Sequence, residues 1–412
     1  MRAIDATTPV LALKAHHGTL GIARSLGRLG VPVHVVHGDL RHAALRSRYV
    51  AGAYAWDFAS APAARTIERL LELGHGLRAG VPVILIPTSD DTAELVADHA
   101  AALREVFRFQ ENAPALVRGL SHKRSLHALA LRHGIPTAET TFPQSLEEVR
   151  RFAAGASFPV MLKASDGLRL QARTGKKMVI VRTPAELLEQ YQRLEDPAEP
   201  NLMLQEYIPG GDDTIWMFNG YFDARSDCVF GVTGKKLRQY PVHTGATSLG
   251  ICLENPVVRE LTCRLMKAIG YRGILDIGFR YDARDGGYKL LDPNPRIGQT
   301  FRLFVSREGM DVVRYLYGDL TGQPLPAGTP SEGRKWIVED WDLESSLDYR
   351  REGALRWADW LGSFAGVEEG AWFAWDDWAP LRGVAGGLAA RARPALRKRL
   401  LPRAGSLAKA RA

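Results

Sequence analysis

The first 118 residues alternate short β-rich runs with helical stretches, and this alternation constrains the fold more than any other feature. Residues 8–15, 31–39 and 81–91 contain apolar runs with the length and composition of buried strands. Residues 18–30 and 61–80, which lie between them, carry apolar side chains at helical spacing. Because strands separated by helices usually pair in parallel, residues 1–118 predict a parallel α/β domain.

Two polar loops follow strands of this predicted sheet. The sequence His-His-Gly occupies residues 16–18, and Thr-Ser-Asp-Asp occupies residues 88–91. Ligands bind at the carboxyl ends of parallel strands, so both loops are candidates for a substrate site. An ordinary loop is an equally good explanation, because Asp90 or Asp91 would cap a helix that begins near Thr92.

The composition is that of a soluble globular protein with several structural units. Of its 412 residues, 46% are hydrophobic and 24% are charged. No stretch approaches the roughly 18 apolar residues of a membrane helix, and the N-terminus reads better as a strand than as a signal peptide. We therefore expect a cytoplasmic protein. The three cysteines lack metal-ligand or redox spacing and are expected to be free thiols.

The formal charge of +8 arises at the C-terminus. After Asp377 the sequence holds nine basic residues and no acidic one, which leaves 45 basic against 46 acidic residues in the rest of the chain. The tail at 381–412 could lie on anionic lipid as a peripheral membrane contact, or it could be a frayed, solvated segment. Nucleic acid is not an expected partner, since the tail has no aromatic residue for stacking.

The middle of the chain predicts two α+β units. In residues 119–200 a helix ends at Gly134, a strand ends near Lys163, and a basic, glycine-containing loop follows at 166–177. Residues 201–328 begin a second β-rich unit whose last part reads as a hairpin, with its turn at 285–287.

The end of this hairpin reads Leu-Leu-Asp-Pro-Asn-Pro-Arg at residues 290–296. Asp292 and Asn294 share a face because they are two residues apart, and the hairpin register brings them beside Asp276. Three oxygen ligands without cysteine or histidine nearby suit Mg²⁺. Taken alone, the segment is explained equally well as a strand end, where Asp, Asn and Pro are frequent.

A magnesium–phosphate site also needs cations and a wall for the nucleotide base. Eight basic residues lie at turns or element ends: Lys123, Lys163, Lys176, Lys177, Lys235, Lys236, Arg296 and Arg302. The edge strand at 204–211 could present backbone groups to adenine, and Asp212 is placed to accept hydrogen bonds from ribose hydroxyls. Lysines at loop ends are usually only solvated, so none of them is decisive alone.

The order of these segments resembles the ATP-grasp superfamily, whose members include D-alanine–D-alanine ligase and biotin carboxylase. Six segments recur in one order over residues 1–325. The resemblance implies an N-terminal parallel α/β domain at 1–118, followed by two α+β subdomains at 119–200 and 201–328 that hold ATP between them. Loop 166–177 departs from the family in being more basic, and the second metal-binding acid is aspartate where glutamate is commoner.

The resemblance also implies roles for individual residues. Lys123 and Lys163 match two lysines that contact the phosphates and the adenine side. Gln205, Glu206, Tyr207 and Ile208 match the hinge strand that bonds adenine, Asp212 matches the ribose ligand, and Lys236 or Lys235 matches a further phosphate-binding lysine. Asp276, Asp292 and Asn294 match the metal ligands, with Mg²⁺ as the expected ion and Mn²⁺ as an alternative. Arg296 matches the arginine that touches the phosphate or acyl phosphate.

The implied function is an ATP-dependent carboxylate–amine ligase that forms an amide through an acyl phosphate, with Arg296 and Lys236 as catalytic residues. Loop 166–177 would close over the site and exclude water. Two alternatives are a kinase-like ATP-grasp enzyme without an amine acceptor and a non-catalytic nucleotide-binding scaffold, which the retained metal ligands disfavour. The expected partners are a small carboxylate and an amine, and a homodimer is a further alternative.

Seven of the nine tryptophans lie within residues 336–378. We expect a compact unit with an aromatic core at 329–380, and the alternative is a ligand-stacking or membrane-interface role. This region and the loops of the N-terminal domain are expected to select the substrate.

Overall fold

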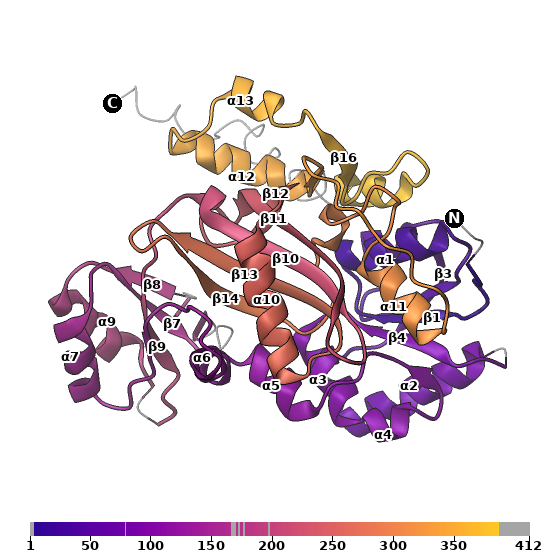
Figure 1. Ribbon diagram of the computed structural model, residues 1–412, viewed down its shortest axis with the longest axis horizontal. Coiled ribbons are helices and arrows are strands. Elements are labelled where there is room, and N and C mark those ends of the chain that lie inside the picture. Colours follow the sequence, from indigo (N-terminus) through magenta and orange to yellow (C-terminus); the bar gives the residue numbers. More distant parts are fainter. Residues whose placement is uncertain are drawn as a thin grey trace, which may run out of the picture.

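A computed structural model describes residues 4–386, apart from residues 79, 166–169, 172–173, 176–177 and 197. These residues form three β-sheets covered by helices (Figure 1). Lys176 and Lys177, much of the predicted closing loop and the basic tail from residue 387 onward lie outside the described residues. Loop closure and the contacts of that tail stay predictions.

The N-terminal domain contains a five-stranded parallel sheet in the order β3-β2-β1-β4-β5. Its strands are β1 (Val10–Leu13), β2 (Val33–His37), β3 (Val50–Ala55), β4 (Val83–Pro87) and β5 (Phe107–Arg108). Its helical segments are α1 (His17–Gly27), η1 (Ala43–Arg46), α2 (Ala63–Leu77), α3 (Asp90–Asp98) and α4 (Ala100–Leu103), and α5 (Pro114–Ser121) leads out of it. Alternate residues of β1 enter two different hydrophobic cores, so the sheet is packed on both faces. The predicted parallel α/β domain is confirmed.

A four-stranded antiparallel sheet forms the first α+β subdomain, in the order β6-β9-β7-β8. The strands are β6 (Thr140–Thr141), β7 (Val160–Ala164), β8 (Met178–Val181) and β9 (Leu202–Glu206), and the helices are α7 (Leu146–Gly155) and α9 (Pro184–Leu194). The preceding helix α6 (Lys123–Arg132) packs Leu126 and Ala130 into the core beneath the seven-stranded sheet. The predicted boundary at 200/201 is wrong by a strand, because β9 pairs with β7 in this sheet. Apolar residues of β9, such as Leu204, pack into the core of this subdomain.

The second subdomain is a seven-stranded sheet in the order β14-β13-β10-β11-β12-β15-β16. The strands are β10 (Ile215–Phe222), β11 (Cys228–Tyr240), β12 (Ala246–Cys252), β13 (Gly273–Asp282), β14 (Gly287–Asn294), β15 (Lys335–Ile337) and β16 (Val367–Gly370). The 3₁₀ turn η2 (Asp212–Thr214) precedes them, α10 (Pro256–Ile269) covers one face, and η3 (Phe301–Leu303) and α11 (Val312–Leu320) lie toward the N-terminal domain. Leu275 and Ile277 face α10, so Asp276 between them faces the other side.

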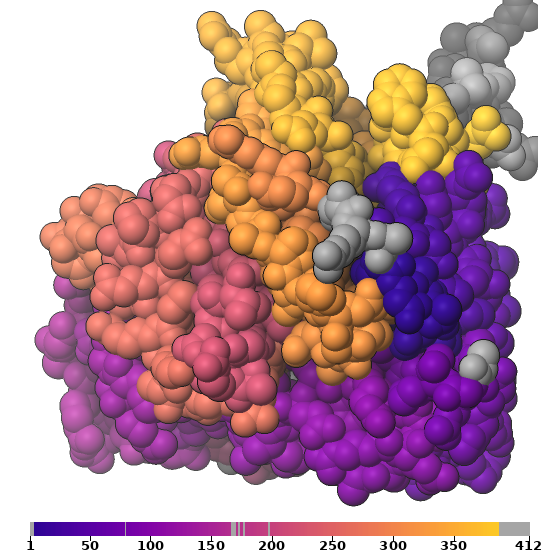
Figure 2. Space-filling model, turned by 45° about the vertical axis from the view of Figure 1, so that its right-hand side comes forward, coloured from indigo at the N-terminus to yellow at the C-terminus, as the bar shows by residue number. Residues whose placement is uncertain are grey.

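The tryptophan-rich region does not form the separate aromatic unit that was predicted. It adds β15 and β16 to the seven-stranded sheet and continues in α12 (Glu339–Arg351) and α13 (Trp357–Gly362). Trp336 is buried in the core shared with α1, whereas Trp375 is 82% exposed. In Figures 1 and 2 this C-terminal region lies beside the N-terminal domain. Within the described residues no helix is both long and apolar enough to cross a bilayer.

Candidate active site

The predicted metal ligands meet on one face of the β13–β14 hairpin. Asp276 and Asn294 are direct cross-strand partners, and Asp292 pairs with Gly278. Residues 276 and 278 lie on the same face, as do 292 and 294, so all three ligands project to one side. Asn294 Nδ2 donates a hydrogen bond to Asp276 Oδ2 over 3.2 Å. The structure thus brings together the three oxygen donors that the sequence predicted.

The surroundings of Asp276 suit a bound cation. Burial raises the pKa of its carboxyl to about 6, and the nearby charge of Asp292 adds to this rise. Gly298 lies against it: a β-carbon there would be 2.4 Å from Asp276 Cγ. Two carboxylates and an amide oxygen form a donor set of the kind that binds Mg²⁺. In the described part of the chain no group of three or more His, Cys, Asp or Glu side chains could hold a metal. The present site differs from such a group because its third donor is the amide of Asn294.

Arg296 connects this face to the N-terminal domain. Its Nη2 donates to Asn294 Oδ1 over 2.9 Å, and its Nε donates to Asp90 Oδ1 over 2.8 Å. Asp90 is the first residue of α3, which follows β4, and its neighbour Asp91 pairs with Lys14 after β1. The helix cap is Ser89, which forms a capping box with Thr92, so neither aspartate is the cap. The carboxyl ends of the parallel strands therefore adjoin the sheet face that carries Asp276, Asp292 and Asn294, which we call the predicted metal face.

Two lysines lie near this region, Lys163 on β7 and Lys123 at the start of α6. Lys163 Nζ donates to Gln205 Oε1 over 2.8 Å, and Lys123 Nζ donates to the Ala164 carbonyl. Burial lowers the pKa of Lys163 to about 8, the charge of Lys123 lowers it further, and Asp292 opposes both. The interaction with Asp292 shows that Lys163 and the metal face are close enough to feel each other's charge.

Of the two adjacent lysines on β11, only Lys236 faces the carboxylates. Burial lowers the pKa of Lys236, while Asp292, Asp276 and Asp212 oppose this change. Its Nζ donates to the carbonyl of Gly245 and to Gln239. Lys235 points to the opposite face, with Nζ 5.8 Å from the Trp216 ring centroid. The structure does not bring Lys235 to the site, because successive strand residues alternate in direction.

The predicted nucleotide hinge covers the end of β9 and the two residues after it. Its acidic residue Glu206 and the predicted ribose ligand Asp212 already have partners. Glu206 accepts hydrogen bonds from Arg284 and Lys289, so its carboxylate ties the two subdomains together. Asp212 accepts from Gln239 Nε2 over 2.8 Å and from the Tyr349 hydroxyl. Tyr207 is half-buried, and Ile208 is buried. The adenine and ribose roles of this segment stay predictions.

Known proteins of similar sequence or structure include ligases and a biotin carboxylase. No protein-family model matches the chain. D-aspartate ligase of Enterococcus faecium is 25% identical over 249 residues, covering 57% of this chain and 58% of that protein. The chain thus matches little more than half the length of this relative.

Two solved structures share the fold at low sequence identity. Biotin carboxylase of Campylobacter jejuni superposes with a TM-score of 0.61 at 17% identity, over 81% of this chain and 75% of that one. L-amino acid ligase of Bacillus licheniformis gives a TM-score of 0.56 at 13% identity, over 79% and 75%. The chain has the ATP-grasp fold. The predicted resemblance is confirmed.

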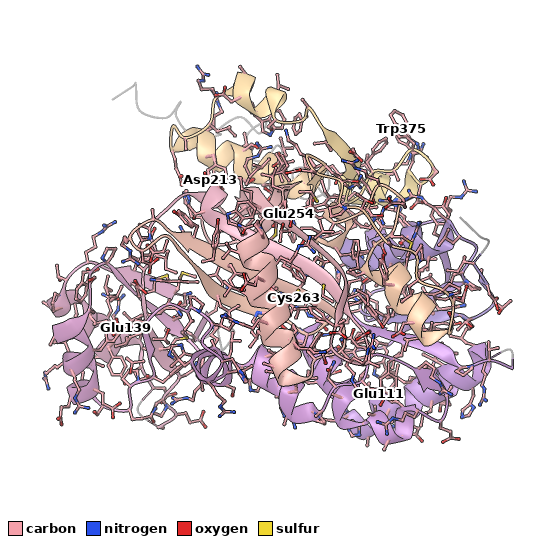
Figure 3. All side chains as sticks on the ribbon, in the orientation of Figure 1. Glu111, Glu139, Asp213, Glu254, Cys263 and Trp375 are labelled. Atoms are coloured by element: carbon pink, nitrogen blue, oxygen red, sulfur yellow. The ribbon has the colours of Figure 1, made fainter. Side chains whose placement is uncertain are left out.

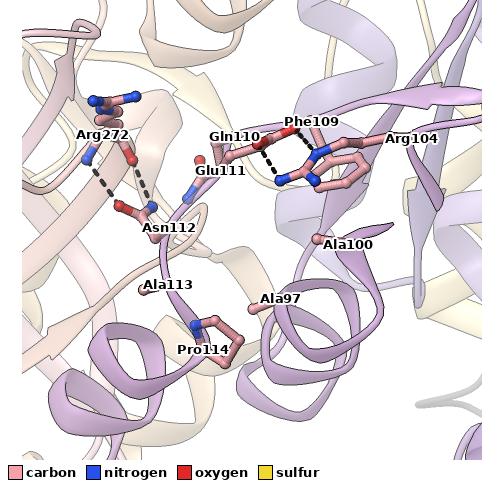
Figure 4. A pocket seen from close by; sticks show the side chains of 10 residues that line it. All are labelled: Ala97, Ala100, Arg104, Phe109, Gln110, Glu111, Asn112, Ala113, Pro114 and Arg272. Atoms are coloured by element: carbon pink, nitrogen blue, oxygen red, sulfur yellow. Dashed lines mark hydrogen bonds and ion pairs between the residues drawn. The ribbon is translucent and has the colours of Figure 1, made fainter. Parts of the chain in front are cut away.

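One cavity of about 230 Å³ lies outside the predicted ATP-grasp site (Figure 4). It is bounded by the Arg104–Glu111 ion pair and by hydrogen bonds between Asn112 and Arg272. None of the predicted site residues lines it. We assign it no role in the ATP-grasp chemistry.

The sequence did not reveal how the two ends of this ATP-grasp chain meet. Arg24 of α1 is fully buried and pairs with Asp377, and its guanidinium also donates to the carbonyls of Ala371 and Trp372. His17, at the start of α1, has its ring centroid 4.8 Å from that of Trp341. A buried arginine within an apolar helix stretch was the one available signal, since such a charge requires a partner.

Proposed function

We propose that the protein is an ATP-dependent carboxylate–amine ligase, which forms an amide through an acyl phosphate and releases ADP and phosphate. The observation that carries this proposal is the convergence of Asp276, Asp292 and Asn294 on one sheet face, with Arg296 bonded to Asn294. Phosphoryl transfer requires oxygen ligands for a metal ion and basic side chains that stabilise the phosphate charge.

ATP would bind between the four-stranded sheet and the seven-stranded sheet. The hinge segment from Gln205 to Ile208 would bond adenine, Asp212 would accept from the ribose, and Lys123 and Lys163 would contact the phosphates. Burial lowers the pKa of Lys163 because the charged ammonium loses its contacts with water. A bound phosphate would supply a negative partner and favour the charged form again.

Asp276, Asp292 and Asn294 would hold magnesium. The ion would neutralise charge on the terminal phosphates. Their oxygen donors and the raised pKa of Asp276 both favour a divalent cation at this point.

In the first step an oxygen of the substrate carboxylate attacks the γ-phosphorus, and the bond to the β,γ-bridging oxygen breaks to release ADP. In the second step the neutral amine attacks the acyl carbon, phosphate leaves, and the amine proton passes to solvent. Lys236 and Arg296 neutralise the charge on the transferred group, so no protein nucleophile is needed. Arg296 also fixes the position of the N-terminal domain through Asp90.

The decisive experiment is a screen of small carboxylates and amines with ATP and Mg²⁺, in which ADP, phosphate and coupled products are measured. We expect ADP release that depends on a carboxylate and an amide product that depends on an amine. Asp292→Ala combined with Asn294→Ala should abolish both, whereas Asp285→Ala, at the turn of the same hairpin, should not. Unchanged ADP release in the double variant would refute the metal face. A phosphorylated product that ignores every amine would establish the kinase-like alternative.

A further inference from the structure

Two neighbouring aromatic side chains contain buried nitrogen atoms without a hydrogen-bond partner. They are His17 Nε2 and Trp336 Nε1, in side chains that are 4% and 1% exposed. Their ring centroids are 5.8 Å apart. Unpaired buried polar groups are rare, because each loses its bonds to water and costs about 1–3 kcal/mol. Two of them side by side form a candidate recognition point for a ligand that carries a hydrogen-bonding atom.

Their position connects them to the proposed chemistry. Gly250 of β12 pairs with Lys236 on one side and with Trp336 on the other, so these two side chains lie in one row across the sheet. His17 begins α1, and a β-carbon on the next residue, Gly18, would lie 3.0 Å from the Cα of Gln299. Gln299 comes shortly after Asn294, the last residue of the β13–β14 hairpin. The unpaired atoms thus adjoin the phosphoryl-transfer end of the site.

The surroundings of these atoms are aromatic. The Trp341 ring meets His17 edge-on at 4.8 Å, and the Trp372 ring lies 6.0 Å from it. Trp372 Nε1 donates to Asp340 over 2.9 Å, so this indole is satisfied while that of Trp336 is not. Trp341 is only half-buried and also packs 5.9 Å from Tyr240. An apolar or aromatic group would be well matched to this wall.

Lys236 bonds the Gly245 carbonyl and Gln239, and the proposed mechanism assigns its charge to the transferred group. Apart from Lys236, the basic side chains around these atoms are neutral or already paired with carboxylates among the described residues. Burial lowers the pKa of His16 to about 4 and that of His17 to about 3, so both rings are neutral near pH 7. Arg302 pairs with Asp311 and Glu369, and Lys14 pairs with Asp91. A second carboxylate on the ligand would therefore remain uncompensated, which is costly in a buried site.

We propose that His17 and Trp336 form the subsite for the carboxylate substrate, and that this substrate is a monocarboxylic acid with an apolar or aromatic side chain. The Trp336 indole donates to an oxygen of the carboxyl group, and Trp341 contacts the apolar part. This inference rests on the proposed ligase function. It predicts a preference different from the dicarboxylic substrate that the name D-aspartate ligase implies for that relative.

The first test is Trp336→Phe, which removes the N–H and keeps an aromatic ring. Its matched control is Trp375→Phe, at a side chain that stands on the surface (Figure 3). We expect KM for the carboxylate to rise about tenfold in the first variant only, as for one lost hydrogen bond to a charged acceptor, with KM for ATP within twofold. A lower melting temperature with unchanged KM for the acid would show a purely structural role and overturn the proposal.

The second test measures acid binding by calorimetry without turnover, using phenyl- or alkyl-substituted monocarboxylic acids against aspartate and glutamate. We expect the apolar acids to bind at least tenfold more tightly. His17→Leu should weaken them and His17→Gln should restore part of the affinity. Tighter binding of dicarboxylates, no binding of any acid, or a change confined to KM for the amine would overturn the subsite. If no acid stimulates ADP release although acids bind, the ligase function fails and the subsite stands.

Discussion

The proposed metal face and the proposed His17–Trp336 subsite are built by the chain in different ways. Asp276 and Asn294 are 18 residues apart in one hairpin, where strand alternation alone places them on one face. His17 and Trp336 come from opposite ends of the sequence and meet because the C-terminal region extends the seven-stranded sheet beside the N-terminal domain. The proposed metal ligands thus come from a single sequence motif, whereas the proposed substrate subsite depends on the tertiary fold.

Asp276→Asn should have the largest effect, and it tests the proposed metal site that the hairpin forms. Removing one negative ligand should lower kcat by about 10²–10³-fold, because the terminal phosphate charge loses its metal-held compensation. Steady-state ADP release with saturating substrates measures this. Asp285→Asn, in the turn of the same hairpin, is the control and should retain full activity. A kcat within twofold of the parent protein would remove Asp276 from the metal site.

Arg24→Met tests the contact between the two ends of the chain, because it should lower the free energy of unfolding. Asp377 would remain buried without its partner, which costs about 3–5 kcal/mol in the free energy of unfolding. Urea unfolding measures the loss. Arg28→Met is the matched control on the same helix, since its pair with Asp376 is partly exposed and should contribute about 1 kcal/mol or less. Equal effects of the two variants would show that the buried pair does not fasten the C-terminal region to α1.

The buried histidine also predicts a pH dependence. Burial lowers the folded pKa of His17 to about 3, below its ordinary value of 6.5, so the folded state resists protonation. Stability from this group is therefore present above pH 6.5 and is lost as the pH falls toward the folded pKa. Between pH 7 and pH 4.5 the parent protein should lose about 2–3 kcal/mol more than His17→Gln. Parallel stability curves for the two proteins would contradict the buried, neutral state.

Gly298→Ala tests the close approach to Asp276 without changing any charge. Its β-carbon would collide with the carboxyl group, so the side chain must move and magnesium-dependent activity should fall about tenfold. The control is Gly119→Ala in α5, where a β-carbon meets nothing within 4 Å. The apparent affinity for Mg²⁺, from activity titrations, reports the change. Equal affinities in both variants would mean that Gly298 does not shape the metal face.

The limits of prediction from the sequence follow the same division. The parallel sheet and the hairpin ligands were predictable because strand periods and residue spacing act over a few residues. The position of β9 was not, since Leu202–Glu206 reads as a strand but its pairing with β7 depends on tertiary contacts. Lys235 and Lys236 could not be separated until the register of β11 was known. The pairing of Arg24 with Asp377 likewise required the fold.

The most direct test of the central claim is to trap the acyl phosphate. The protein is incubated with ATP, Mg²⁺, a stimulating carboxylate and hydroxylamine, and the hydroxamate is measured together with ADP. The account predicts one hydroxamate per ADP in the parent protein and a rate of hydroxamate formation about 10²–10³-fold lower in Asp276→Asn. ADP release by the parent protein without any hydroxamate would contradict transfer of the γ-phosphoryl group to a carboxylate at this face.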